Sequence, residues 1–279
     1  MNNCTLNVDH VSGQGTTQHI NLKLPLSQQT LQTQSYILSL CSKYAYLDEI
    51  EGIKKFCELN FAAELIDYNE SQIYILNNGS ELVIVCRGTE PTEFKDIQAD
   101  LQLKMTSALI GNGKVHEGFQ KSVFNIWQTL SKRLRYNKTK TLYCTGHSLG
   151  AAMATIIAYY LQNDPDMPTP KAIFSYGSPK VGNSIYIDEI KVEHYRFVNN
   201  ADIVTRLPTW PYSHCGIIYY MNHWGNIRKL TWAQSIKDIW RGFFKGLEVH
   251  EINFFTNHFI DRYCNNLERW SLNIERLQT

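Results

Sequence analysis

A serine at position 148 stands in a context that could make it a nucleophile. Ser148 is the centre of a Gly-x-Ser-x-Gly motif, between an apolar run that ends at Thr145 and a run of small residues that begins at Gly150. This pattern predicts a sharp turn between a buried strand and a helix. Gly146 and Gly150 lack a Cβ atom, so the strand and the helix can approach each other closely. A chance motif in a loop is the alternative, and the flanking pattern argues against it.

A serine hydroxyl needs a base, and the base needs a carboxylate that orients it. With the serine in this kind of turn, the acid and then the histidine follow it in the chain. Asp202 lies in the loop after a predicted strand and is the expected acid. The alternatives are two residues in a proline-rich loop and one in a predicted helix: Asp164, Asp166 and Asp188.

Several histidines follow Ser148 and compete for the role of base: His194, His214, His223, His250 and His258. His258 lies at the expected start of the last helix, from which it could reach back to the serine. His214 closely follows Asp202, and we expect it to anchor a loop rather than to act in catalysis. His194 precedes Asp202 and therefore has the wrong chain order.

The negative charge that develops during attack on a carbonyl needs two N–H donors. One is expected from the backbone of Leu149, at the start of the helix after the serine. The other is expected from Thr89, in the loop after the predicted strand 81–86, which could offer both its N–H and its hydroxyl.

The elements that must position these residues follow from hydrophobic periodicity. Helical spacing predicts helices over about 28–46, 50–59, 118–135 and 149–162. Short apolar runs predict strands over 72–76, 81–86, 139–145, 172–176 and 194–198, and an Asn-Gly turn joins the first two as a hairpin. Strands that alternate with helices indicate an α/β fold with a mostly parallel sheet covered on both faces.

Length and composition limit the domain organisation. The chain has 279 residues, of which 43% are hydrophobic, and this suits one α/β domain over residues 28–279. Residues 1–27 are polar and form an N-terminal arm whose role is unknown. A net charge of +1 and scattered basic residues argue against a nucleic-acid partner.

Cysteine usage and the N-terminus suggest a location. The seven cysteines are odd in number and have no Cys-x-x-Cys spacing, which argues against a zinc site and a complete disulfide framework. The N-terminus lacks the pattern of a Sec-type signal peptide, and no run of about 18 apolar residues occurs. We expect a reduced, cytoplasmic protein, with export by another route left open.

Six segments together resemble one family, the class 3 lipases, which include the fungal triacylglycerol lipases. In chain order they are Cys-Arg-Gly-Thr at 86–89, Val-His-Glu-Gly-Phe at 115–119, Thr-Gly-His-Ser-Leu-Gly at 145–150, Tyr-Gly-Ser-Pro-Lys-Val-Gly-Asn at 176–183, Asn-Ala-Asp-Ile-Val-Thr-Arg-Leu-Pro at 200–208 and Asn-His at 257–258. The resemblance covers about residues 30–270. Ala151 and Asn257 depart mildly from residues that are commoner in the family.

The resemblance implies an α/β-hydrolase fold with a central, mixed and mostly parallel sheet. It also implies hydrolysis of lipid carboxylic esters without a cofactor or metal. The implied roles are Ser148 as nucleophile, Asp202 as acid and His258 as base, with Thr89 and Leu149 as oxyanion donors. A phospholipase A1 and an esterase of small esters are alternatives within the same class. A silent, lipase-like binding scaffold is the alternative outside it, and the three filled triad positions argue against it.

Two amphipathic segments could meet the lipid. Phe94 and Ile97 share an apolar face in residues 90–101, which form either a movable lid or a fixed surface helix. Trp240, Phe243 and Phe244 lie in residues 231–247, which have a basic polar face. This second segment either covers the core or contributes to an acyl pocket or to transient contact with a membrane or lipid-droplet surface.

Overall fold

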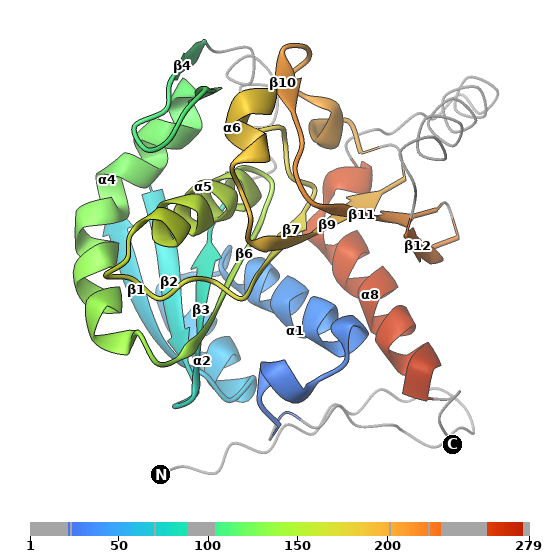
Figure 1. Cartoon of the computed structure of the whole chain (residues 1–279). Coiled ribbons are helices and arrows are strands. Elements are labelled where there is room, and N and C mark those ends of the chain that lie inside the picture. Colours follow the sequence, from blue (N-terminus) through green and yellow to red (C-terminus); the bar gives the residue numbers. More distant parts are fainter. Residues whose placement is uncertain are drawn as a thin grey trace, which may run out of the picture.

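The computed structural model describes residues 22, 24–69, 71–88, 104–200, 202–222, 224–229 and 256–275. Its centre is an eight-stranded sheet with the strand order β1-β2-β3-β6-β7-β9-β11-β12 (Figure 1). These strands are β1 (Ala62–Tyr68), β2 (Ser71–Asn77), β3 (Glu81–Cys86), β6 (Thr141–His147), β7 (Ala172–Tyr176), β9 (Glu193–Asn199), β11 (Ile217–Met221) and β12 (Ile227–Lys229).

The middle of this sheet is parallel and its edges are antiparallel. β3, β6, β7, β9 and β11 run parallel to one another, whereas β1, β2 and β12 pair antiparallel with their neighbours. The predicted hairpin is the β2–β3 pair, in which Asn77 lies opposite Leu82. Gly79 in its turn has a φ of 99°, which favours glycine. The predicted mixed, mostly parallel sheet is therefore confirmed.

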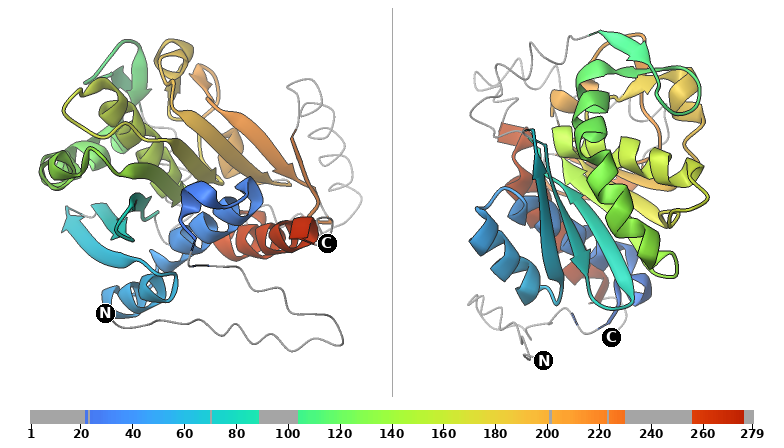
Figure 2. Two further views of the ribbon diagram at one scale, coloured as in Figure 1. Left: turned by 60° about the horizontal axis from the view of Figure 1, so that its bottom comes forward. Right: turned by 90° about the vertical axis from the view of Figure 1, so that its left-hand side faces the viewer.

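Helices cover both faces of the sheet (Figure 2). One face packs against α4 (Glu117–Leu134) and α5 (Leu149–Asn163), and the other against α1 (Leu31–Tyr44), α2 (Glu49–Glu58) and α8 (Ile260–Glu275). Strand side chains alternate between the two faces, so Ile84 joins the core under α5 while Val83 and Val85 join the core under α1. The two cores explain why the central strands are apolar on both sides.

A smaller antiparallel sheet was not predicted. Its strand order is β10-β8-β5-β4, with β4 (Met105–Ser107), β5 (Lys114–His116), β8 (Gly182–Asn183) and β10 (Tyr212–Ser213). Strands of two or three residues are too short to show a period of two. The remaining elements are the short helices η1 (Leu26–Gln28), η3 (Arg135–Asn137), α6 (Ser184–Asp188), η4 (Val204–Arg206) and η5 (Thr256–His258).

Leu26 and Ser27, near the start of the described chain, are hydrogen-bonded to the central sheet. Leu26 is buried in the core beside α1. The buried carboxylate of Glu81, the first residue of β3, accepts hydrogen bonds from the backbone N–H groups of Leu26 and Ser27, both at 2.7 Å. A buried carboxylate is costly unless its oxygens are satisfied, and these bonds satisfy them. Within the described part of the chain, no helix is long and apolar enough to cross a membrane.

Candidate active site

Ser148 occupies the sharp turn that the sequence predicts. It stands between β6 and α5 with φ 56° and ψ −128°, a strained conformation for a residue with a Cβ atom. Its backbone N–H donates to the carbonyl of Tyr176 in the neighbouring strand at 3.0 Å. A Cβ on Gly146 would lie 2.5 Å from the Gly150 carbonyl, and one on Gly150 would lie 2.1 Å from the Cys86 carbonyl. Both glycines are therefore required by close backbone approach.

Asp202 and His258 meet in the protein interior, although 56 residues separate them. The two carboxylate oxygens of Asp202 lie 3.0 and 2.9 Å from Nδ1 of His258, which donates the hydrogen bond. Asp202 is fully buried and His258 is 4% exposed. Asp202 lies in the loop between β9 and η4, and His258 ends the short helix η5 before α8. The predicted acid and base are thus brought together, and Asp202 fixes which ring nitrogen carries the proton.

Further donors hold the Asp202 carboxylate. The Tyr263 hydroxyl of α8 donates to Oδ2 at 2.6 Å, and the Val204 backbone N–H donates to Oδ1 at 3.0 Å. Burial and the Asp202 charge raise the pKa of Tyr263 well above its ordinary value, so the hydroxyl keeps its proton and stays a donor. The buried carboxylate is therefore oriented from two elements besides the histidine.

Gly177, next to β7, lies directly against the Asp202–His258 pair. It has a φ of 59°, and a Cβ at this position would lie 2.9 Å from Oδ2 of Asp202 and 3.0 Å from the His258 ring. Contacts this short leave no room for a side chain. The Tyr-Gly-Ser-Pro segment therefore has a direct structural task, which is to let the acid and the base pack against the end of the central sheet.

His147 ties the nucleophile turn to the base. Its Nε2 lies 2.6 Å from the backbone carbonyl of His258, and its Nδ1 lies 2.9 Å from the Tyr46 hydroxyl. A carbonyl can only accept, so Nε2 donates and Nδ1 accepts from the tyrosine. Burial and the neighbouring His258 lower the pKa of His147 well below its ordinary value, which keeps the ring neutral. The residue before Ser148 thus fixes the backbone of His258.

The competing histidines have other partners. His214 donates from Nε2 to the Thr205 carbonyl at 2.6 Å, which is the loop-anchoring role expected for it. His194, in β9, bonds through Nε2 to the Ser175 hydroxyl at 2.7 Å and through Nδ1 to the Cys215 sulfur at 3.2 Å. Ser175 and His194 therefore form a second serine–histidine pair, but a thiol occupies the place of the carboxylate.

The competing carboxylates also lie elsewhere. Asp166 forms an ion pair with Lys138 at 3.0 Å. Asp164 accepts the Asp166 backbone N–H in the same loop, and Asp188 ends α6. Within the described ranges, no group of three or more His, Cys, Asp and Glu side chains could hold a metal ion.

The two oxyanion candidates are Leu149 and Thr89. Leu149 is the first residue of α5, so its N–H precedes the hydrogen-bond ladder of the helix. Thr89 lies outside the described residues. Its neighbour Gly88 fits closely against the turn, because a Cβ there would lie 2.6 Å from the His147 carbonyl. The other predicted residues outside the described part are Phe94, Ile97, Trp240, Phe243 and Phe244, and the histidines His223 and His250.

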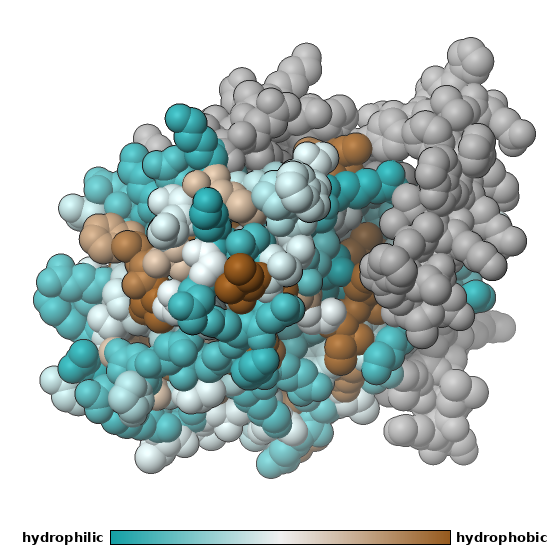
Figure 3. Space-filling model, turned by 45° about the horizontal axis from the view of Figure 1, so that its top comes forward, coloured by the Kyte–Doolittle hydropathy of each residue, from teal (hydrophilic) through white to brown (hydrophobic). Residues whose placement is uncertain are grey.

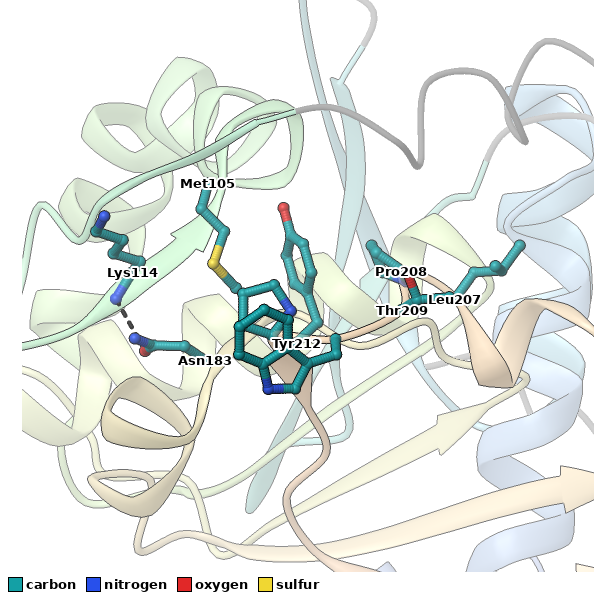
Figure 4. A pocket seen from close by; sticks show the side chains of 9 residues that line it. Met105, Lys114, Asn183, Leu207, Pro208, Thr209 and Tyr212 are labelled. Carbon is teal, nitrogen blue, oxygen red and sulfur yellow. Dashed lines mark hydrogen bonds between the residues drawn. The ribbon is translucent and has the colours of Figure 1, made fainter.

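A cavity of about 740 Å³ lies between the small sheet and the chain after η4 (Figure 4). Its lining includes Met105, Lys114 and residues 207–212. Trp210 in this lining is 90% exposed. Figure 3 shows that hydrophobic residues on the face it draws lie in small groups within a mostly hydrophilic surface. Neither Ser148 nor His258 lines the cavity, so we do not assign the substrate to it.

Sequence reasoning missed three residues that shape the site: His147, Gly177 and Tyr263. His147 had a signal, because it belongs to the nucleophile motif itself. Gly177 also had one, as a glycine directly after a predicted strand. Tyr263 had none, since only the folded chain places the hydroxyl of α8 beside Asp202.

Comparison with known families gives one match over the middle of the chain. The family model described as Lipase (class 3) matches residues 83–212, which include Ser148 and Asp202. The chain is 31% identical over 155 residues to a secreted mono- and diacylglycerol lipase of Fusarium solani, covering 52% of this chain and 45% of that protein. It is 30% identical over 179 residues to the toxin TseL of Vibrio cholerae, covering 50% of this chain and 28% of that protein. The chain thus spans less than half the length of these two curated relatives.

Solved structures support the fold. The lipase of Rhizomucor miehei superposes with a TM-score of 0.61 at 21% identity, over 75% of this chain and 91% of that one. A variant of the Penicillium cyclopium protein MDLA superposes with a TM-score of 0.63 at 20% identity, over 83% of this chain and 94% of that one. Together with the sheet order and the turn at Ser148, these likenesses establish the α/β-hydrolase fold.

Proposed function

We propose that this chain, whose residues 83–212 match the class 3 lipase family, is a serine hydrolase that cleaves carboxylic esters of lipids. The observation that carries the proposal is the buried Asp202–His258 hydrogen bond, together with a serine on a strained strand-to-helix turn. His147 joins the two parts through its bond to the His258 carbonyl.

The proposed reaction is acyl transfer in two steps. Asp202 holds Nδ1 of His258, so Nε2 takes the proton of Ser148 as the serine oxygen attacks the ester carbonyl. The ester C–O bond then breaks, and His258 returns the proton to the leaving alcohol. In the second step His258 takes a proton from water, the water oxygen attacks the acyl-enzyme, and Ser148 recovers its proton as the carboxylic acid leaves.

The oxyanion of both steps is assigned to the backbone N–H of Leu149 and to Thr89. Leu149 begins α5, so the positive end of the helix dipole also faces charge that develops near Ser148. Thr89 stays a prediction from the sequence, supported by the fit of Gly88 against the nucleophile turn.

The proposed substrate class is a lipid ester with a glycerol-type backbone. Three of the relatives are named as mono- and diacylglycerol lipases, from Fusarium solani, Penicillium cyclopium and Penicillium camembertii. A phospholipase A(1) of Arabidopsis thaliana is 36% identical over 67 residues, and this favours phospholipid acyl chains as the second candidate. The head group separates the two candidates, because the chemistry at the carbonyl is the same.

The first test is hydrolysis of p-nitrophenyl butyrate and palmitate by the wild type and by Ser148→Ala. We expect activity on at least one ester in the wild type and its loss in the variant. A panel of mono-, di- and triacylglycerol and phosphatidylcholine then separates lipase from phospholipase A1. A folded wild type that neither hydrolyses an ester in detergent nor reacts with a fluorophosphonate probe would support a binding scaffold instead.

We further propose transient contact with a lipid surface, on the basis of the amphipathic pattern in residues 231–247. Co-sedimentation with liposomes should fall in Trp240→Asp, and unchanged binding by the folded variant would contradict the proposal. A cytoplasmic location stays a prediction from cysteine usage and the N-terminal sequence. Fractionation of cells that produce the chain would test it.

A further inference from the structure

Arg196 is a buried cation that forms no ion pair with any residue in the described part of the chain. It lies in β9, is 5% exposed, and precedes Asp202 by six residues. Its Nε atom has no hydrogen-bond partner, and none of the ion pairs among the described residues includes its guanidinium. A buried charge is ordinarily paired and hydrogen-bonded, because transfer of an unpaired ion out of water is strongly unfavourable. A negatively charged partner would stabilise buried Arg196, and the described side chains do not provide one.

A small cavity adjoins Arg196. Its volume of about 10 Å³ is close to the room that one water-sized species needs. It lies on the α5 side of the central sheet and is lined by polar groups from four segments, including the Thr155, Ser178 and Ser213 hydroxyls, the His194 and His214 rings and the Cys215 thiol. The lining contains no carboxylate.

The charge of this cavity is positive at neutral pH. Burial lowers the pKa of Arg196 only to about 10, so the guanidinium stays protonated. Burial and the Arg196 charge lower the pKa of His194 to about 3 and that of His214 well below its ordinary value, so both rings are neutral. Burial and Arg196 also lower the pKa of half-buried Lys180. Three neighbouring groups thus respond to one uncompensated positive charge.

We propose that the cavity is a binding site for a small monovalent anion of the halide class, chloride in the cell. An anion compensates the Arg196 charge, which a neutral water cannot do. The small volume restricts the anion to a single-atom species and excludes a sulfate or phosphate. The Arg196 guanidinium and the Ser213 hydroxyl in the lining can donate to an anion, whereas the Thr155 and Ser178 hydroxyls already donate to backbone carbonyls. The site is separate from the Ser148 centre and does not depend on the proposed hydrolysis.

Bromide diffraction locates the anion directly. Crystals of the wild type, soaked in sodium bromide and measured at the bromine absorption edge, should show an anomalous peak in contact with the Arg196 guanidinium. The same soak of Arg196→Met should leave that position without a peak. Surface bromide peaks in wild-type crystals that lack the peak at Arg196 would overturn the proposal.

Solution stability separates a true site from binding at crystal concentration only. Thermal unfolding is measured in sodium chloride against sodium gluconate at equal ionic strength. Chloride should raise the Tm of the wild type by about 3 °C for each tenfold increase above its dissociation constant. Exposed Arg228 gives the matched control, because Arg228→Met should keep the chloride response while Arg196→Met loses it. Equal Tm values in the two salts for the wild type, or an unchanged response in Arg196→Met, would refute the site. If Arg196→Met does not fold, the wild-type diffraction and salt series decide.

Discussion

Two buried serine–histidine sets lie at the central sheet, and they differ in the backbone at the serine and in the partner of the histidine. Ser148 stands at a positive φ ahead of α5, whereas Ser175 lies within β7. His258 is bound to a carboxylate, whereas His194 is bound to the Cys215 thiol. A neutral thiol cannot stabilise an imidazolium as a carboxylate does. Burial and the Arg196 charge lower the pKa of His194 to about 3, so its ring stays neutral.

The comparison shows that residue types alone do not make a nucleophile. Ser175 and His194 are close, buried and hydrogen-bonded at 2.7 Å, yet their histidine stays neutral and their serine is fixed within a strand. The strained turn and the carboxylate distinguish the Ser148 set. Substitutions that affect one set and spare the other can test this difference.

The largest expected effect comes from the two serines. Ser148→Ala should lower kcat for ester hydrolysis by about 10⁴-fold or more, because the nucleophile is gone. Ser175→Ala should leave kcat within a few-fold and lower the free energy of unfolding by about 1 kcal/mol through one lost hydrogen bond. Steady-state kinetics and urea unfolding measure both. Loss of activity in a folded Ser175→Ala protein would reverse the assignment.

Removing the carboxylate charge should have the next largest effect. Asp202→Asn keeps the shape but no longer stabilises protonated His258, so kcat should fall by roughly 10³–10⁴-fold with KM little changed. Asp188→Asn, at the end of α6, is the control and should match the wild type. An Asp202→Asn variant with near wild-type kcat would show that the His258–Asp202 bond is structural only.

Packing of the pair should have a smaller effect. Gly177→Ala places a methyl group about 3 Å from both Asp202 and His258, so kcat should fall by roughly 10–100-fold as the geometry shifts. Gly79→Ala is a matched control, because Gly79 also has a positive φ but a Cβ there would meet nothing within 4 Å. Both should lose about 1 kcal/mol of stability from backbone strain. Equal kcat in the two variants would rule out a positioning role for the space at Gly177.

Tyr263 tests the support of the carboxylate. Tyr263→Phe removes the hydroxyl that donates to Asp202 and should lower kcat about tenfold, with KM unchanged. Tyr143→Phe is the control, because the buried Tyr143 hydroxyl has no hydrogen-bond partner among the described residues. Tyr143→Phe should keep both kcat and stability. If both variants keep full activity, the Tyr263 bond contributes only to folding.

Acid should destabilise the fold through the histidines outside the triad. The unfolded chain takes up a proton on each histidine near pH 6.5, while folded His194, with a pKa of about 3, does not. The free energy of unfolding should therefore fall as the pH drops below about 6.5, by about 1.4 kcal/mol per pH unit for each such histidine. Urea unfolding between pH 7 and 5 should show a flatter slope in His194→Gln. An identical slope in the variant would contradict the assignment.

The sequence predicted what depends on local pattern. The β2–β3 hairpin follows from two apolar runs around an Asn-Gly turn, and β7 was predicted with its observed bounds, Ala172–Tyr176. The turn at Ser148 follows from the glycines of its motif. The pairing of Asp202 with His258 could be proposed because chain order in this kind of hydrolase restricts the choice.

Other features depend on contacts that no local pattern records. β1 lies at the edge of the sheet with most of its side chains partly or fully exposed, so it lacks a buried stripe that a sequence could reveal. Arginine is usually exposed, so its residue type predicts a surface position for Arg196. In the structure Arg196 lies in β9 and is buried. Only the folded arrangement decides such burial.

The contact between Gly150 and the Cys86 carbonyl has a dynamic consequence. The start of α5 cannot separate from the end of β3 without opening the centre of the sheet, so the Ser148 amide, which donates to the Tyr176 carbonyl, should be among the slowest to exchange with solvent. On the timescale of turnover this turn behaves as a rigid body. Any motion that admits a substrate must then arise in segments that carry neither the serine nor the strands beside it.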